Sequence, residues 1–433
     1  MKYLSVSLVL FVALFSAVGQ ATELDEILDS TVDFDIPAVT EPESKIKLDF
    51  AYQIGVEAGG KNELNSHKLE SRFQWQDFLT QKIYASVDAK LLARLPKDQS
   101  LSKGKDAEAD YRVRELSLQR NWQAFSLKAG MQPVIWGEMD TLTITDVMTP
   151  WDYSEFAFTS PEDARVAQGT IRLNYFSSQA TMDLVYTPYP LANRFPGGSA
   201  ESLLDLMLPG IEVQYDEDFP KVGDDYELGM RVKTTQGPSD YGLYVAHVMS
   251  DLPFFQLVSP PLTFPWQMEL QYSSYDMLGI SANRSMGNLL WKLELAYKDN
   301  MYLPGLEFIR RDVIEVGAGF DYNANGSYDL TLEILNQQIR SGEGQLVGMK
   351  PRNNQVNLRW SKNFLHQTLA TVYYFSYQVQ YGDRTHAASL QYKLNDDWRV
   401  DMVGTLFQIE NTESPMQFID DWDSVVLRIN YTI

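Results

Sequence analysis

The chain has 433 residues, a formal net charge of −22 and no cysteine. Without cysteine it cannot form disulfides, thiolate metal sites or a cysteine nucleophile, and its acidic balance argues against nucleic-acid partners. Length alone would allow two or three soluble domains, but no proline- or glycine-rich linker divides the sequence.

The first residues are typical of an export signal. Lys2 precedes an apolar run from Leu4 to Val18, and Gly19 and Ala21 supply the small residues of a cleavage site. We expect residues 1–21 to form a cleaved signal peptide and residues 22–45 an acidic periplasmic segment. No later segment reaches the roughly 18 apolar residues that a membrane helix needs, so any insertion into a membrane must use strands.

From residue 46 onward the dominant pattern is alternation of apolar and polar residues. It is clearest over residues 83–95 and 289–298 and less regular over 369–381. Side chains of a strand point alternately to two faces, so each stretch predicts a strand with one apolar face. Eighteen strands are expected, at about 46–58, 66–77, 82–95, 111–120, 124–132, 168–176, 179–187, 226–235, 240–250, 267–284, 289–298, 312–322, 328–340, 354–362, 367–381, 385–393, 398–409 and 424–433.

The connections between these strands alternate in length. Tight links such as 177–178, 236–239 and 394–397 fall at every second connection, whereas long segments such as 133–167 and 188–225 lie between them. Bacterial outer-membrane barrels show this segregation, with short turns and both termini on the periplasmic side. The sequence therefore predicts an all-β fold, a transmembrane antiparallel β-barrel of about 18 strands (16–18) over residues 46–433, located in the outer membrane.

The last strand supports the same architecture. Its alternate residues form one continuous apolar face, made of Val425, Leu427, Ile429, Tyr431 and Ile433. A sheet persists in lipid only when it is closed, and a barrel of this size leaves room for a water-filled channel.

The long segment 133–167 contains the candidate functional residues. Residues 134–156 carry five carboxylates and no lysine or arginine, so a loop folded into the lumen would form an acidic constriction. The expected lining residues, with Trp136 as an anchor and Arg165 as a facing cation, are Trp136, Glu138, Asp140, Asp146, Asp152, Glu155 and Arg165. Arg112, Arg114 and Arg120 are further candidates for the facing charge. A solvated surface loop remains an alternative, as does a calcium site, although the ligand spacing fits no known calcium loop.

The same stretch carries a family resemblance. The pattern consists, in chain order, of Trp136-Gly137-Glu138, Asp140, Asp146-Val147, Asp152 and Glu155-Phe156. This pattern resembles the signature of a proteobacterial family of porin-like outer-membrane barrels whose function is unassigned. Weaker likenesses to the same family lie at Tyr226 to Arg231, Tyr241 to Tyr244 and Met277 to Ile280. The resemblance implies an outer-membrane location and a transport-like role, in association with transporters of hydrophobic or lipid-like compounds.

The segment 251–266 has one charged residue and many large apolar ones. A hydrophobic-ligand port would use Phe254, Phe255, Leu257, Phe264 and Trp266, since exposed apolar patches mark binding sites. Packing of loops on one another over the barrel mouth explains the same composition.

The function that these patterns favour is an outer-membrane channel or export conduit without enzymatic activity, cofactor or metal. Its expected partners are outer-membrane lipid and a periplasmic or inner-membrane transporter component. Two alternatives remain open. One is a non-conducting scaffold, and the other is an outer-membrane hydrolase, although none of the four histidines, His67, His247, His366 and His386, lies in a known catalytic motif.

Overall fold

The computed structural model describes most of the chain, namely residues 45–58, 63–98, 101, 105–154, 164–195, 212–215, 225–252, 254–257, 267–303, 309–342, 346 and 349–433. The predicted signal peptide and the predicted acidic segment up to residue 44 lie outside these ranges. The candidate residues Glu155, Phe264 and Trp266 lie outside them as well.

The described secondary structure is almost entirely strand. Among the residues described, no helix is long and apolar enough to cross a membrane. The elements are β1 (Lys45–Glu57), β2 (Leu64–Thr80), β3 (Ile83–Arg94), β4 (Glu108–Trp122), β5 (Phe125–Gln132), β6 (Gln168–Phe176), β7 (Thr181–Thr187), β8 (Glu212–Tyr215), β9 (Glu227–Gln236), β10 (Ser239–Met249), β11 (Phe254–Leu257), β12 (Gln267–Gln271), β13 (Ser274–Met286), β14 (Leu289–Leu303), β15 (Ile309–Asn323), β16 (Asp329–Ile339), β17 (Arg352–Phe364), β18 (Leu369–Gln378), β19 (Asp383–Lys393), β20 (Trp398–Gln408), the 3-10 helix η1 (Gln417–Ile419) and β21 (Ser424–Thr432).

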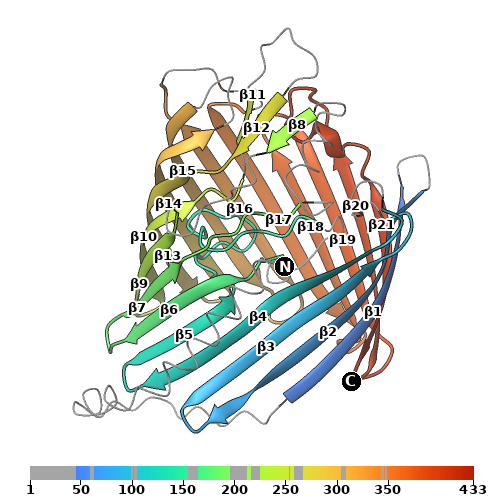
Figure 1. Cartoon of the computed structure of the whole chain (residues 1–433), viewed down its shortest axis with the longest axis horizontal. Helices are drawn as coiled ribbons and strands as arrows, with labels where there is room; N and C mark the ends of the chain where they lie inside the picture. The colour runs from blue at the N-terminus through green and yellow to red at the C-terminus, as the bar shows by residue number, and fades with distance from the viewer. Residues whose placement is uncertain are drawn as a thin grey trace.

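Eighteen of these strands form one sheet that closes on itself (Figure 1). Ala51 of β1 lies opposite Glu70 of β2 on one side and opposite Asn430 of β21 on the other. Because the first and last strands of the barrel pair with each other, the eighteen strands leave no open edge, as a sheet in lipid requires. The predicted eighteen-stranded antiparallel barrel is confirmed.

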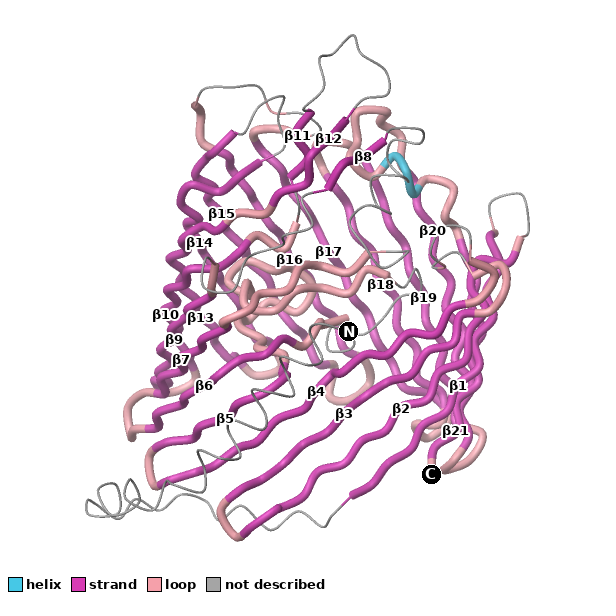
Figure 2. The backbone as a smooth tube through the Cα atoms, viewed as in Figure 1, coloured by secondary structure: helices cyan, strands magenta, loops and turns pink. Residues whose placement is uncertain are grey.

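Tight turns join the strands at one end of the barrel, which we call the turn end. Only two residues separate the paired residues Gln236 and Ser239, and only two separate Met286 and Leu289. In the second turn Gly287 has a φ of 63°, a conformation that two-residue hairpin turns require and that glycine adopts without strain. The other end carries the long connections. One of them, between β5 and β6, turns back and crosses the interior (Figure 2).

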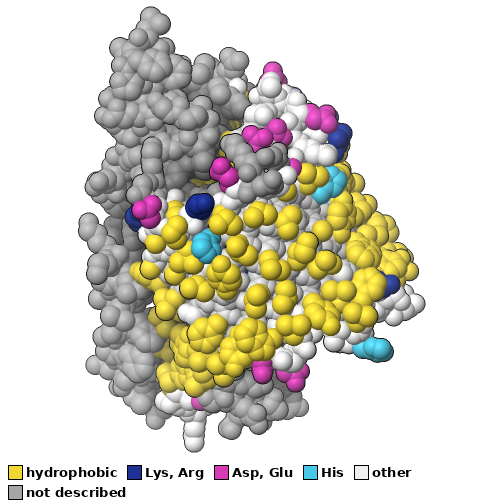
Figure 3. Space-filling model, turned by 90° about the vertical axis from the view of Figure 1, so that its right-hand side faces the viewer, with side chains coloured by type: hydrophobic (Ala, Val, Ile, Leu, Met, Phe, Trp, Pro, Cys, Tyr) yellow, Lys and Arg dark blue, Asp and Glu magenta, His cyan; other side chains and the backbone are white. Residues whose placement is uncertain are grey.

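The outer wall is apolar because the strands alternate as the sequence predicts. In β10, Tyr241, Leu243 and Val245 are 44%, 44% and 45% exposed, while Tyr244 and Val248 between and beyond them are buried. Figure 3 shows hydrophobic side chains gathered in a broad band over this surface. Such a band is what the hydrocarbon layer of a membrane contacts.

The long-loop end differs from the prediction, because it contains two short strands that were not predicted, β8 and β11, and interrupts a predicted one. The strand expected at 267–284 is broken at Tyr272 and Ser273, so that it forms β12 and β13. β12 pairs in parallel with β8 and antiparallel with β11 in a separate sheet (top of Figure 1). Phe254, Phe255 and Leu257 of the predicted hydrophobic port fall in β11, and their side chains lie outside the described part of the structure. The port therefore stays a prediction.

Candidate functional site

The segment Pro133–Ser154, which we call the inner loop, is anchored by a carboxylate of the barrel wall. Glu294 projects inward from β14 and is 1% exposed. One of its oxygens accepts hydrogen bonds from the backbone N–H groups of Glu138 and Met139, and the other accepts them from the N–H and hydroxyl of Thr145. A buried carboxylate without partners would be costly, so Glu294 and the loop backbone stabilise each other.

A second anchor lies two strands further along the wall. Glu333 of β16 is fully buried and accepts hydrogen bonds from the N–H groups of Asp140, at 2.7 Å, and Thr141, at 2.9 Å. Asn357 of β17 donates to the hydroxyl of Thr141 at 3.0 Å. The inner loop therefore reaches from its origin between β5 and β6 to β17 and spans the lumen (Figure 2).

Apolar side chains of the inner loop also hold it in place by packing against the barrel wall. Trp136, Ile144 and Met148 are almost completely buried and form one cluster with inward-facing residues of four strands on one side of the barrel. These wall residues come from β7, β10, β13 and β14 and are Val185, Tyr244, Ala246, Val248, Tyr275, Met277 and Ala296. Burial of an aromatic or aliphatic side chain stabilises a structure by roughly 1.5–3 kcal/mol. The Trp136 ring lies within this cluster, and its role as an anchor of the loop stays a prediction.

Glycines of the barrel wall make room for the inner loop. A Cβ atom on Gly229 of β9 would lie 2.4 Å from the Trp136 ring, and one on Gly317 of β15 would lie 2.2 Å from Ile144. Both separations are far below van der Waals contact, so no larger residue fits while the loop keeps its place. Gly229 belongs to one of the stretches that carry the family resemblance.

Each of the four described carboxylates of the inner loop has a cationic partner. Glu138 pairs with Lys233 at 2.6 Å, and Asp140 pairs with Lys292 at 2.6 Å. Asp146 pairs with Arg165, and Asp152 pairs with Arg112 at 2.8 Å. The Asp140 side chain is 55% exposed, whereas the other three are 11% exposed or less. Asp140 is thus the carboxylate of this set that faces solvent.

Two of these carboxylates, Asp146 and Asp152, have pKa values shifted in opposite directions. Burial raises the pKa of Asp146 to about 6, although the Arg165 guanidinium and the N–H of Trp136 oppose this. Burial would also raise the pKa of Asp152, but Arg112 and the Ser154 hydroxyl outweigh it and hold that pKa below its usual value. Asp152 therefore keeps its charge at neutral pH, while Asp146 gains a proton in mild acid.

The candidate arginines separate into two groups. Arg165 lies 3.6 Å from the Trp151 ring centre, and Arg112 and Arg114 lie within 3.5 Å of aspartates of the inner wall, Asp110 and Asp88. Arg120 lies opposite Ile83 and Leu127. Residues directly opposite on paired strands share a face, so Arg120 is on the outer face, away from the lumen.

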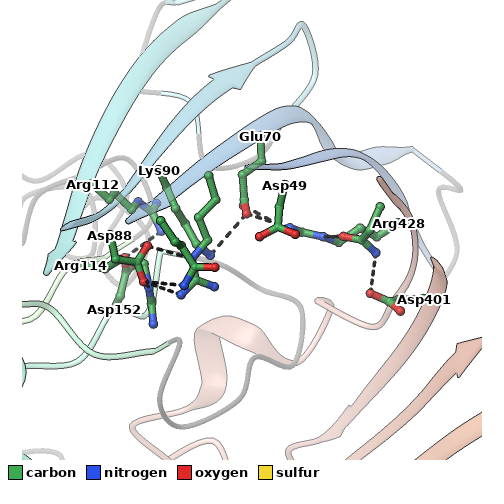
Figure 4. A network of polar contacts seen from close by, with 12 residues as sticks. Asp49, Glu70, Asp88, Lys90, Arg112, Arg114, Asp152, Asp401 and Arg428 are labelled. Atoms are coloured by element: carbon green, nitrogen blue, oxygen red, sulfur yellow. Dashed lines mark hydrogen bonds and ion pairs between the residues drawn. The ribbon is translucent and has the colours of Figure 1, made fainter. Parts of the chain in front are cut away.

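A network of charges covers the inner wall opposite the apolar cluster, on β20, β21 and β1–β4. We call it the charged wall (Figure 4). Glu70 pairs with Arg428 at 2.8 Å and Lys90 at 3.3 Å, and Arg72 pairs with Asp88 at 2.5 Å. Several of these groups remain partly exposed, which places water along this side of the lumen. Within the described ranges, no group of three or more histidine, aspartate and glutamate side chains is arranged to hold a metal ion.

The structure adds residues that the sequence did not single out, chiefly Glu294, Glu333, Gly229 and Gly317. The alternation over 289–298 places Glu294 on the polar face of its strand. Nothing in that pattern indicates which segment the carboxylate contacts, because its partners lie about 150 residues earlier in the chain.

Solved structures with the same fold are outer-membrane porins. The outer membrane protein opdK of Pseudomonas aeruginosa has a TM-score of 0.54 and 11% identity, over 90% of this chain and 99% of its own. OccAB1 of Acinetobacter baumannii has a TM-score of 0.54 and 8% identity, over 90% and 96%. A BenF-like porin from Pseudomonas fluorescens has a TM-score of 0.53 and 10% identity, over 90% and 98%. At these identities the likeness establishes the barrel fold.

A comparison with curated proteins found no match. A family described as proteins of unknown function, DUF1302, matches residues 46–304, more than half of the chain, including the inner loop. This agrees with the predicted resemblance to a barrel family without an assigned function. The chain therefore belongs to the DUF1302 family of proteins of unknown function.

Proposed function

We propose that the protein is an outer-membrane channel, exported by its predicted signal peptide, in which the inner loop narrows the lumen and selects the solutes that pass. The observation that carries this proposal is the attachment of the loop to Glu294 and Glu333 inside a closed barrel. Eighteen strands enclose enough space for a water-filled channel. A loop packed against one side of that space reduces its cross-section.

The arrangement of the walls favours water-soluble solutes. The apolar side chains of the inner loop are buried against β7, β10, β13 and β14, so they are withdrawn from the lumen. The opposite side is the charged wall, which attracts ions and hydrogen-bonding groups. The lipid-like solutes that the family resemblance implies would need an apolar path. Of the described acidic residues in the predicted constriction, Asp140 has the exposed carboxylate, so in this proposal it is the acidic group that faces the passing solute.

Planar-bilayer recording tests both parts of the proposal. We expect wild-type protein to open ion-conducting pores and the Glu138→Gln, Asp140→Asn double variant to show a lower ratio of cation to anion permeability. Asp329→Asn is the matched control, because this aspartate of β16 accepts a hydrogen bond near the turn end and does not contact the inner loop. Failure to conduct at any voltage would reject the channel and favour the scaffold. An unchanged ratio in the double variant would reject the selective role of the loop.

A further inference from the structure

A separate cavity opens inside the barrel at the turn end, which we call the turn-end cavity. Its volume is about 350 Å³, enough for a ligand of several non-hydrogen atoms, since one water molecule occupies roughly 30 Å³ in the liquid. Strands β4, β5, β6, β7 and β9 line it, with the residues Gln119, Ser126, Lys128, Arg172, Asn174, Phe176, Thr181, Asp183, Arg231 and Lys233.

Four of the lining residues are cations, although the whole chain carries a charge of −22. Lys128, Arg172, Arg231 and Lys233 have side chains that are 24%, 23%, 17% and 30% exposed. They come from strands β5, β6 and β9 of the same part of the sheet, where β7 lies between β6 and β9. Water therefore reaches each of these charges within one small space.

The carboxylates that accompany these cations do not balance them. Asp183 is 4% exposed and accepts hydrogen bonds from both Arg172 and Arg231. Lys128 pairs with Glu115 at 2.7 Å, and Lys233 pairs with Glu138 at 2.6 Å. Three carboxylates thus face four cations.

The geometry also leaves donors unused. Asp183 accepts hydrogen bonds from Nε and Nη2 of Arg172, from Nη2 of Arg231 and from Nε1 of Trp136. Asp183 thus already accepts four hydrogen bonds, one at Oδ1 and three at Oδ2, while each guanidinium has more N–H groups than these bonds use. The amide side chain of Asn174 adds a neutral donor to the same lining.

We propose that the turn-end cavity binds an oxyanion group, a carboxylate or a phosphate, of a water-soluble solute. Guanidinium groups hold such oxyanions through paired hydrogen bonds, and lysines add charge without a fixed orientation. The cavity lies at the turn end, whereas the exposed carboxylate Asp140 belongs to the inner loop. Occupancy of the cavity does not require that the barrel conduct, so binding and conduction can fail independently.

Isothermal titration calorimetry of the detergent-solubilised full chain at low ionic strength tests this inference. Inorganic phosphate and succinate serve as separate probes, and the tighter of the two identifies which oxyanion the cavity prefers. Lys128→Gln is expected to weaken binding about tenfold, as the loss of one charge-assisted hydrogen bond predicts. Lys47→Gln is the matched control, because Lys47 is also paired with a carboxylate, Asp49 at 3.1 Å, but lies on β1.

Arg231→Gln provides a second variant within the cavity, and thermal unfolding of each variant verifies that it is folded. Binding of either probe that falls in Lys128→Gln and Arg231→Gln but not in Lys47→Gln supports the inference. Two results would overturn it. One is the absence of measurable heat with both probes, and the other is an equal loss of affinity in the Lys47→Gln control.

Discussion

Glu333 lies on the inner face of β16 and accepts hydrogen bonds from two backbone N–H groups of the inner loop, those of Asp140 and Thr141. Hydrogen bonds to a charged group each stabilise a structure by about 1.5–3 kcal/mol. Loss of this carboxylate removes both bonds and leaves the loop donors without an acceptor. Glu333 is therefore the side chain that accepts both backbone bonds on this side of the barrel, where Asn357 and Lys292 add side-chain contacts to the loop.

Glu333→Ala is expected to release this part of the inner loop and to raise the single-channel conductance, because the loop then occupies less of the lumen. The matched control is Glu315→Ala on β15. Glu315 is also a buried inward carboxylate, and its partners Lys298 and Gln337 both belong to the wall. A larger conductance in both variants, or in neither, would contradict the role of Glu333 as a loop anchor.

Asp146 makes the free energy of unfolding depend on pH, and the burial of its carboxyl group sets the direction of that dependence. Its pKa rises from an ordinary value of 3.8 to about 6, so the folded protein binds this proton more tightly than the unfolded chain does. The contribution of Asp146 to the free energy of unfolding is therefore fully present below pH 3.8 and is lost as the pH rises through 6. Two pKa units correspond to about 3 kcal/mol.

Urea unfolding in lipid vesicles, compared for wild type and Asp146→Asn, measures this contribution. The stability of the wild type relative to the variant is expected to fall by up to about 3 kcal/mol between pH 4 and pH 7. Asp329→Asn, at the turn end of β16, serves as the control for loss of a carboxylate elsewhere. A relative stability that rises over the same interval would show that the ion pair with Arg165 outweighs the effect of burial.

At the scale of elements, the inner loop and strand β9 fit together because Gly229 has no side chain. A Cβ atom at this position would lie 2.4 Å from the Trp136 ring and 2.8 Å from the sulfur of Met148. Protein interiors have no spare volume to absorb such an overlap, so either the ring or the strand must move.

Gly229→Ala is accordingly expected to lower stability and loosen the inner loop, measured as faster cleavage of the folded protein by an added protease. Gly169→Ala on β6 is the matched control, since a Cβ atom there meets only Met131 at 3.9 Å. In a Trp136→Ala background the overlap with the ring is absent and only that with the Met148 sulfur remains, so Gly229→Ala should have a smaller effect than in the wild type, and a double-mutant cycle measures this coupling. Additive effects of the two changes would contradict the steric account.

The strands were predictable from the sequence, whereas the contacts of the inner loop were not. Alternation is a local property, and it located β3, β14 and β21 to within a few residues. The pairing of β12 with β8 runs in parallel over only four residues of each strand, too short to leave a pattern. The partners of Glu294 and Glu333 lie more than 140 residues away, and a polar residue on an inward face does not indicate what it contacts.

At the scale of the whole molecule, the barrel has two unlike inner sides. The inner loop and an apolar cluster fill the side formed by β7, β10, β13 and β14, and the charged wall covers the opposite side, on β20, β21 and β1–β4. Sequence alternation predicted strands with one apolar face. The apolar part arises because Tyr244, Val248 and Met277 face inward at the positions that the loop covers, so both faces of these strands are hydrophobic.

The attachment of the inner loop inside the lumen can be measured directly by disulfide trapping, because the chain contains no cysteine of its own. Thr141 of the loop and Asn357 of β17 are in hydrogen-bond contact, so Thr141→Cys, Asn357→Cys protein should form an intramolecular cross-link on mild oxidation in native outer membranes, detected as a linked peptide by mass spectrometry. Thr141→Cys, Leu358→Cys is the control, since Leu358 is the next residue of the same strand and faces outward. A cross-link in the first variant and none in the control is the predicted result. The absence of a cross-link in the first variant, or equal yields in both, would contradict a loop fixed inside the barrel.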